Sequence, residues 1–296
     1  LSFVYIKDNK PVACAFLPIE KDAQIKSISI CGGYVPAPFF LTQYTSEKIV
    51  MDTIDNIVKQ EKISKVMFCI DPLEFDRFPY NFLVKYNYLD TSLVSYILNC
   101  KESAMRRNHL RAIKKISKDK SFSLHIMDKD NSDYTIHEIY RKLHHKCAGR
   151  ITRPIETYDL QFDMLKHGNA VLVGLKLKNK FIAFTYFMHH CDKAISFSAS
   201  DDPDYDHLPL YHIINDAAIK YLENIGVRHV DTGQPFTPFA QFLYYPDEKQ
   251  RNISLFKTGF SGRFVQSFQG IKYFAKNIFE QDVEDFVKNY KDTIYE

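Results

Sequence analysis

Lys257 stands between two phenylalanines and two glycines in the segment FKTGFSG, residues 256–262. We expect the phenylalanines to anchor a strand and the glycines to permit close approach of the backbone. This arrangement would fix an ammonium group near the end of a sheet. There it could stabilise the oxyanion of acyl transfer, or bind a phosphate. The alternative is a surface lysine on an ordinary strand. We predict the functional role for Lys257 and a substrate contact for Phe256.

Basic residues gather in MRRNHLRAIKKISK, residues 105–118, which has the pattern of a helix with an apolar edge. Such a helix could meet the phosphates of a nucleotide-linked or RNA-borne substrate. It could equally be a solvated linker, since charge runs usually face water. The candidate substrate contacts are Arg106, Arg107 and Arg111, with Lys114, Lys115 and Lys118 in the same cluster, and the apolar edge is Leu110, Ile113 and Ile116.

Four further residues are candidates for the site. Asp231, in HVDTG, is a candidate catalytic residue that could help accept a proton or orient a neighbouring group. It could also cap the turn after its strand, and we favour the turn. Arg150, in CAGR, is a candidate substrate contact. Tyr186 and Tyr205 could line a cleft, although 19 tyrosines make any one choice weakly supported.

The composition excludes several classes of protein. A net charge of +3 over 296 residues gives no global field of the kind that nucleic-acid-binding proteins carry. Six scattered cysteines, none in a CxxC pair, indicate a reducing compartment and buried thiols. Adjacent histidines in HHC, residues 189–191, would face opposite sides of a strand, so we expect no metal. There is no run of about 18 apolar residues, so we expect no membrane span.

The order β-hairpin, strand, helix, strand occurs twice along the chain. Both hairpins carry Asn-Lys in the turn and then an apolar pair ending in Ala. The corresponding elements are 4–18, 25–31, about 46–60 and 63–72 in the first copy, and 171–190, 194–200, 209–225 and 226–235 in the second. This order predicts an α/β fold with a mixed sheet, present in two tandem copies.

The second copy has opening elements that the first lacks: a strand at 122–127 and helices at 133–147 and 157–167. We infer that the equivalent part of the first copy lies upstream of Leu1 or has been lost. The expected organisation is a first lobe at 1–104, a basic connecting helix at 105–120, and a second lobe at 121–296 that ends in a helix.

These elements and motifs resemble the Fem-like branch of the GNAT acyltransferase superfamily, whose members carry two GNAT lobes in tandem and attach amino acids to cell-wall precursors. The segment FKTGFSG is similar to a late FK-x-GFGG segment of that family, with Ser261 as the departure. The resemblance implies that Lys257 lies by the reacting groups or the substrate phosphates.

The acyl donor stays open between aminoacyl-tRNA and acyl-CoA, and we expect no tightly bound cofactor. CoA-dependent GNAT enzymes bind pyrophosphate on a glycine-bearing loop before a helix. The corresponding loop here, SASDDPDYDHLP, has no glycine and four aspartates, which would repel pyrophosphate. Fem-like enzymes mostly use aminoacyl-tRNA. The helical arm with which larger members bind tRNA has no counterpart in this sequence, because no heptad pattern lasts three repeats.

We therefore expect an N-acyltransferase acting on an amine of a sugar-nucleotide, cell-wall precursor or surface glycan, with charged tRNA as a potential partner. The alternatives are a non-catalytic GNAT-fold module that binds a glycan or nucleotide sugar, and an acetyl-CoA-dependent N-acetyltransferase with an atypical CoA site. We expect a cytoplasmic location, near the inner face of the membrane. The oligomeric state stays open.

Overall fold

Two compact units make up the computed structural model, which describes residues 1–22, 25–41, 47–102, 104–237 and 239–294. The first unit contains Leu1–Ser95, Pro235–Ser254 and Val265–Glu296, and the second contains Tyr96–Gln234 and Leu255–Phe264. The expected lobes at 1–104 and 121–296 concern copies in the sequence and remain a prediction. The two compact units are defined by contacts between residues, and by these contacts the late segments Pro235–Ser254 and Val265–Glu296 belong to the first unit.

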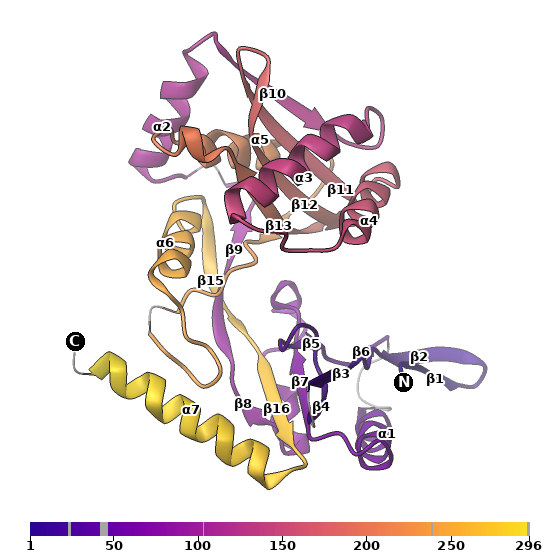
Figure 1. The fold of residues 1–296 in the computed structure, drawn as a ribbon. Coiled ribbons are helices and arrows are strands. Elements are labelled where there is room, and N and C mark those ends of the chain that lie inside the picture. Colours follow the sequence, from indigo (N-terminus) through magenta and orange to yellow (C-terminus); the bar gives the residue numbers. More distant parts are fainter. Residues whose placement is uncertain (23–24, 42–46, 103, 238, 295–296) are drawn as a thin grey trace. The chain divides into compact units, whose positions relative to one another are not determined.

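The second unit is built on a seven-stranded mixed sheet, as the predicted fold class requires (Figure 1). The pairs β10–β11, β11–β12, β12–β13 and β14–β9 are antiparallel, whereas β13 and β14 run parallel. In order across the sheet the strands are β10 (Phe122–Met127), β11 (Ala170–Leu177), β12 (Lys180–His190), β13 (Lys193–Asp201), β14 (His229–Asp231), β9 (Leu93–Asn99) and β15 (Gly262–Ser267).

Alternating apolar side chains of β11 build a core on each face of this sheet. Val171 and Val173 belong to the core on the side of α5 (Leu210–Asn224), against which α2 (Arg107–Ser117) packs. Leu172 belongs to the opposite core, covered by α3 (Tyr134–Ala148) and α4 (Ile155–Lys166). Helices on both faces explain why β11 is a continuous apolar run.

The first unit has a six-stranded sheet and a separate three-stranded one. Helix α1 (Glu47–Gln60) contributes Val50, Ile54 and Val58 to its core. The larger sheet contains β3 (Ile19–Asp22), β4 (Ile25–Ile28), β7 (Lys65–Cys69), β16 (Gln269–Tyr273) and β8 (Leu89–Asp90), with β5 (Val35–Pro36) also paired to β7. The smaller sheet contains β1 (Phe3–Lys7), β2 (Lys10–Ala15) and β6 (Phe39–Phe40).

The remaining elements are two α-helices and three short 3-10 helices. They are α6 (Glu248–Lys257), α7 (Lys276–Ile294), η1 (Pro72–Glu74), η2 (Phe82–Tyr86) and η3 (Pro203–Tyr205). Helix α7 is tied to the sheet because Lys65 and Tyr273 both donate to the carboxylate of Asp282. Within the described ranges, no helix is both long and apolar enough to span a bilayer.

Both expected hairpins form, at β1–β2 and β11–β12, and the strand at 122–127 has the expected bounds. The first hairpin differs from the second in lying in its own small sheet with β6. The expected helix at 46–60 is α1, and its first residue, Ser46, lies outside the described residues. Two local expectations are wrong. Lys257 ends a helix, α6, and does not lie on a strand. The thiols are mostly not buried, since Cys100 is buried whereas Cys14, Cys31 and Cys191 are exposed.

Candidate active site

The candidate site in the second unit lies where β13 and β14 stop pairing. Their register ends at Ile195 and Asp231, whereas β13 continues to Asp201. On the other side of β13, the register with β12 shifts between Tyr186 and Phe187, which marks a bulge. Parting strands and a bulge leave backbone groups without ladder partners, and such places often border active sites. The side chains that meet there decide what chemistry is available.

Lys257 contributes an ammonium group to this place. It is the last residue of α6, and its Nζ donates a hydrogen bond to the carbonyl oxygen of Thr232, directly after β14. Burial lowers the pKa of Lys257 to about 8, although the negative charge of Asp231 acts in the opposite direction. A cation of this kind, held on a backbone carbonyl beside a carboxylate, can stabilise negative charge on a substrate.

Side chains at the start of α2 hold the end of α6 and thereby position Lys257. Arg106 donates to the carbonyl oxygen of Leu255 at 3.1 Å and to the hydroxyl of Thr258 at 2.7 Å. The Nε2 of buried His109 donates to the carbonyl oxygen of Phe256 at 2.9 Å. Carbonyls in the last turn of a helix lack intrahelical partners, and a cation there is favourable. Arg106 thus stabilises the helix end that presents Lys257.

The two glycines of FKTGFSG lie where neighbouring groups come too close to the backbone for a side chain to fit. A Cβ on Gly259 would lie 2.1 Å from the ring of His109, and one on Gly262 would lie 2.4 Å from the carbonyl oxygen of Ile97 in β9. The two phenylalanines pack into the core, Phe260 buried and Phe256 stacked on His109 with ring centroids 5.2 Å apart. The segment is therefore a helix end wedged between α2 and β9, from which the Lys257 ammonium reaches the backbone directly after β14.

Asp231 caps the turn after β14. It is buried, and its Oδ1 accepts a hydrogen bond from the backbone N–H of Gly233 at 3.0 Å. Gly233 has a φ of +68°, and a Cβ there would lie 2.5 Å from the carbonyl oxygen of Ser196. The turn is accordingly specific to glycine. The negative charge of Asp231 also favours the charged form of Lys257, so the residue that caps the turn acts on the ammonium group as well.

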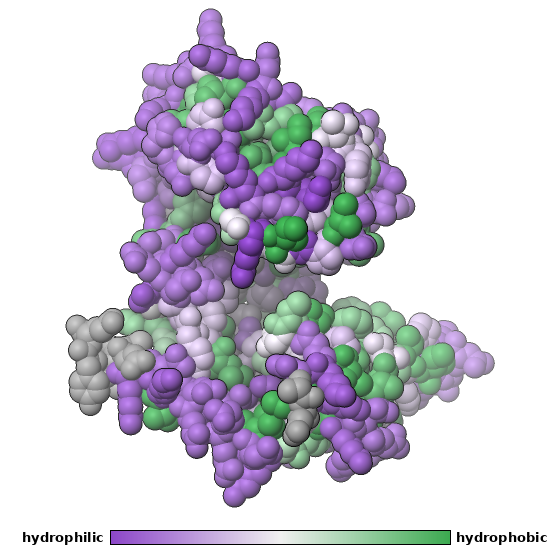
Figure 2. Space-filling model, in the orientation of Figure 1, coloured by the Kyte–Doolittle hydropathy of each residue, from purple (hydrophilic) through white to green (hydrophobic). Residues whose placement is uncertain are grey.

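The basic helix presents most of its charge to solvent. Figure 2 shows a largely hydrophilic surface over α2. His109 and Ile116 face the core, whereas Leu110, expected on the apolar edge, is 50% exposed. Arg106 is used at the end of α6, as described. The residues left exposed, for which no ion pair is seen within the described ranges, are Arg107, Arg111, Lys114, Lys115 and Lys118.

Of the other expected contacts, Tyr186 is enclosed, and no contact of Arg150 or Tyr205 with Lys257 is seen within the described residues. Tyr186 is fully buried, its hydroxyl donates to the carbonyl oxygen of Gln161 at 2.7 Å, and burial raises its pKa far above the usual range. Arg150 is exposed just after α3. Tyr205 lies in η3, with the ammonium of Lys180 5.3 Å from its ring centroid.

The aspartate-rich loop is partly neutralised by lysines. Asp202 is 1% exposed, and it accepts hydrogen bonds from Lys146 and from Lys180, the latter at 2.9 Å. Burial acts to raise its pKa, but the two lysines outweigh burial and hold the pKa at about 2. Cys147 donates to the neighbouring Asp201 at 3.1 Å. These carboxylates hold η3 against α3 and the β11–β12 hairpin, so they have a structural use.

Asp202→Asn should lower the unfolding free energy at pH 7 by about 1–2 kcal/mol, because the amide loses the charge-assisted bonds. The pKa of Asp202 lies below its reference of 3.8. Its stabilisation is therefore present above pH 4 and disappears as the pH falls through about 2. Urea denaturation at several pH values should show the two proteins converging in acid. Asp204→Asn is the control, since Asp204 shares Lys146 but its side chain is 70% exposed. A pH-independent difference would contradict the assignment.

Two residues of this site were missed by the sequence reasoning. Thr232 accepts the Lys257 hydrogen bond through its backbone, which no side-chain pattern can reveal. His109 lies within the basic segment, where its neighbours suggested a solvated face. The signal that could have identified it is spacing, since His109, Ile113 and Ile116 recur at helical intervals.

Comparison with known proteins agrees with this fold. Residues 103–240 match the family model described as an acetyltransferase (GNAT) domain. No curated protein sequence matches the chain. A crystal structure of FemX matches with a TM-score of 0.64 and 12% identity, over 95% of this chain and 89% of that chain. L-PGS from Bacillus licheniformis matches with a TM-score of 0.62 and 10% identity, over 93% of this chain and 86% of that chain. A tandem GNAT protein from the clavulanic acid biosynthesis pathway matches with a TM-score of 0.50 and 11% identity, over 92% of this chain and 82% of that chain.

At these identities the solved structures show a shared fold, and the family model adds the acetyltransferase assignment for 103–240. The predicted resemblance and fold class are confirmed. Residues 103–240 match a GNAT-type acetyltransferase domain, and the chain shares its fold with FemX and with a tandem GNAT protein.

Proposed function

We propose that the protein is an N-acyltransferase that transfers an aminoacyl or acyl group to an amine on a sugar-nucleotide, a cell-wall precursor or a surface glycan. The observation that carries this proposal is the ammonium of Lys257, held at the end of β14 by the carbonyl of Thr232 and beside Asp231. The resemblance of FKTGFSG to the Fem-like segment supports the same residue, and Phe256 is the adjacent candidate for a substrate contact.

In this reaction the acceptor amine attacks the carbonyl carbon of the donor ester. The new C–N bond forms, the C–O bond to the donor breaks, and the proton lost by the amine ends on the departing hydroxyl. Lys257 would stabilise the oxyanion of the tetrahedral intermediate. Asp231 is committed to Gly233 and acts on Lys257, so its proposed role is to orient the lysine; solvent carries the proton.

Aminoacyl-tRNA is the donor that we favour. The exposed charges of Arg107 and Arg111 on α2 suit a polyanion, because each phosphate that they neutralise releases counterions. The loop where a CoA pyrophosphate would be expected carries Asp201, Asp202, Asp204 and Asp206, and only some of this charge is offset by Lys146 and Lys180. Pyrophosphate at that loop would meet a net negative potential.

Arg107→Ala and Arg111→Ala should each weaken tRNA binding several-fold and reduce the slope of log K against log salt by about 1. The measurement is a filter-binding titration at several salt concentrations. Lys249→Ala, an exposed charge on α6, is the control and should change little. Unchanged affinity and slope in both arginine variants would rule out α2 as the surface that binds RNA.

The function as a whole is tested by a thermal-shift screen over CoA esters, charged tRNA and UDP-linked sugars, followed by mass spectrometry of any acyl-amide product. Stabilisation by charged tRNA and a UDP-linked sugar, with product formed, is expected. Stabilisation by CoA esters alone would overturn the donor assignment and favour the acetyl-CoA-dependent alternative. Binding of a sugar-nucleotide without product under any donor would favour the non-catalytic module.

A further inference from the structure

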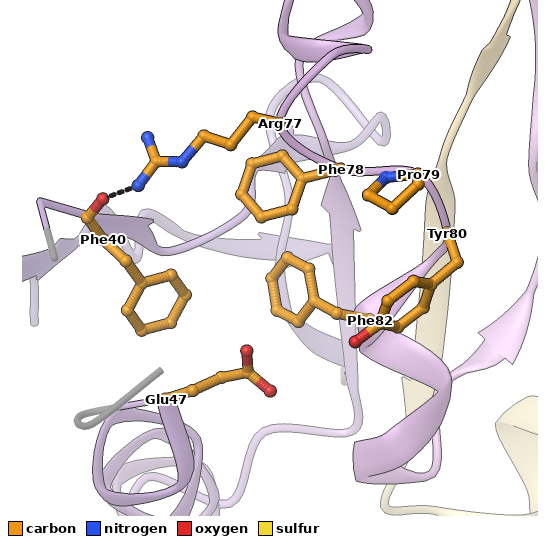
Figure 3. A pocket seen from close by; sticks show the side chains of 7 residues that line it. All are labelled: Phe40, Glu47, Arg77, Phe78, Pro79, Tyr80 and Phe82. Atoms are coloured by element: carbon orange, nitrogen blue, oxygen red, sulfur yellow. Dashed lines mark hydrogen bonds between the residues drawn. The ribbon is translucent and has the colours of Figure 1, made fainter. Parts of the chain in front are cut away.

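The first unit contains a small cavity of about 30 Å³ that the proposed reaction does not use. Four aromatic rings line it, together with one carboxylate and one guanidinium (Figure 3). The rings are those of Phe40, Phe78, Tyr80 and Phe82, and the charged groups are Glu47 and Arg77. An aromatic enclosure with a carboxylate at its base is chemically suited to a cation.

The carboxylate belongs to Glu47, the first residue of α1, whose side chain is only 15% exposed. It points toward the space between the rings of Phe40 and Phe82 (Figure 3). One oxygen, Oε1, accepts a hydrogen bond from the hydroxyl of Tyr86 at 2.8 Å. A carboxylate withdrawn from water among aromatic rings is costly unless a positive charge comes to meet it.

The rings themselves already attract cations of the protein. The guanidinium of Arg77 lies 5.3 Å from the centroid of Phe78, at the opposite end of the cavity from Glu47, and donates to the carbonyl oxygen of Phe40 (Figure 3). The Nζ of Lys85 lies 4.9 Å from the centroid of Tyr80 and 4.0 Å from Oε1 of Glu47. The Lys85 side chain is 47% exposed, so a ligand can displace it from Glu47 at little cost.

We propose that this cavity binds a primary ammonium group at the end of an aliphatic chain, of the kind carried by a lysine side chain or an alkyl diamine. The ammonium contacts Glu47 and the faces of Phe40 and Phe82, in the place that Lys85 approaches from outside. The volume admits a group about the size of one or two water molecules, and a quaternary ammonium is too large. The proposal is independent of the acyl-transfer site in the second unit.

The test is a titration of the full chain with n-butylammonium chloride, followed by NMR or calorimetry. Saturable binding with a Kd of about 1–10 mM is expected, as suits one cation–π and ion-pair site. Tetramethylammonium and neutral n-butanol should bind at least tenfold more weakly. Glu47→Gln should weaken n-butylammonium binding at least tenfold. Lys85→Gln, which removes the competing ammonium, should strengthen it several-fold.

The opposite signs of the two variants separate ligand binding from damage to the fold, because unfolding cannot tighten binding. Glu61→Gln is the charge-matched control, since Glu61 follows the far end of α1 and its side chain is 41% exposed. It should leave the Kd unchanged. The proposal is overturned if n-butanol binds as well as n-butylammonium, if Glu47→Gln matches the wild type, or if Lys85→Gln binds no more tightly.

Discussion

Lys257→Met should reduce the turnover number of acyl transfer by about 10²–10³-fold, the loss typical when one oxyanion-stabilising group is removed. The same substitution should stabilise the fold. Burial holds the pKa of Lys257 at about 8, against an ordinary value of 10.5, so the folded protein disfavours the charged form. At pH 7 the charge is nevertheless present, and removing it should raise the unfolding free energy by about 1–2 kcal/mol. Replacing a purely structural lysine would not lower turnover while raising the stability of the fold.

The pH dependence gives a second signature of Lys257. Between about pH 8 and 10.5 the unfolded chain binds the proton more tightly than the folded protein, so the wild type gains stability as the pH rises through this window. The stability advantage of Lys257→Met should therefore be largest at pH 7 and shrink toward pH 10. Wild-type turnover should fall as Lys257 loses its proton above pH 8, and Lys257→Arg, whose charge persists, should lack that fall.

Both signatures can be measured side by side. Chemical denaturation at several pH values gives the stability difference without a substrate. Turnover uses the donor and acceptor identified by the thermal-shift screen. Lys249→Met removes an exposed lysine from the same helix and should alter neither quantity. If Lys257→Met destabilises the protein at pH 7 and leaves turnover intact, the lysine is structural and the proposed mechanism fails.

The sequence singled out Lys257 as a candidate site residue but assigned it to the wrong element. Phe256 and Phe260 stand four residues apart, a spacing that fits a helix face as well as a strand, and the glycines suggested a strand end. The structure shows the end of α6. Lys257 is the one charged residue of FKTGFSG, so composition alone singled it out whichever element it belongs to.

Other parts of the fold were beyond the sequence because they depend on contacts between distant segments. Strand β16 joins β7 across about two hundred residues, so the composition of the first unit cannot be seen in any local pattern. Tyr186 was chosen by residue type, yet strand alternation and the α3–α4 cover enclose it completely. Local order fixes hairpins and helices well, whereas burial of one tyrosine among 19 is decided by tertiary packing.

Gly259→Ala should destabilise the protein by about 2–3 kcal/mol, because the new methyl group would lie 2.1 Å from the ring of His109. That ring cannot withdraw, since it is 2% exposed and packs against the rings of Phe256, Phe260 and His212. His109→Ala alone should also destabilise, by about 2–3 kcal/mol, through lost packing. In the double variant the methyl group enters the space that the ring vacates, so the double loss should be well below the sum.

The coupling is measured by urea denaturation of the four proteins in the cycle. Gly149→Ala is the matched control: Gly149 has a φ of +66° with nothing within 4 Å of the added methyl, so it should cost about 1 kcal/mol and show no coupling to His109. Strictly additive losses for Gly259 and His109 would mean that the two residues do not meet.

The double variant also separates packing from positioning. It should recover stability, yet it still lacks the hydrogen bond from Nε2 of His109 to the carbonyl of Phe256, the residue before Lys257. If the ammonium must be held within a few tenths of an ångström to stabilise the oxyanion, turnover should remain low while stability returns. Turnover that recovers in step with stability would mean that α6 needs only to be folded, and that His109 has no part in placing Lys257 at the end of β14.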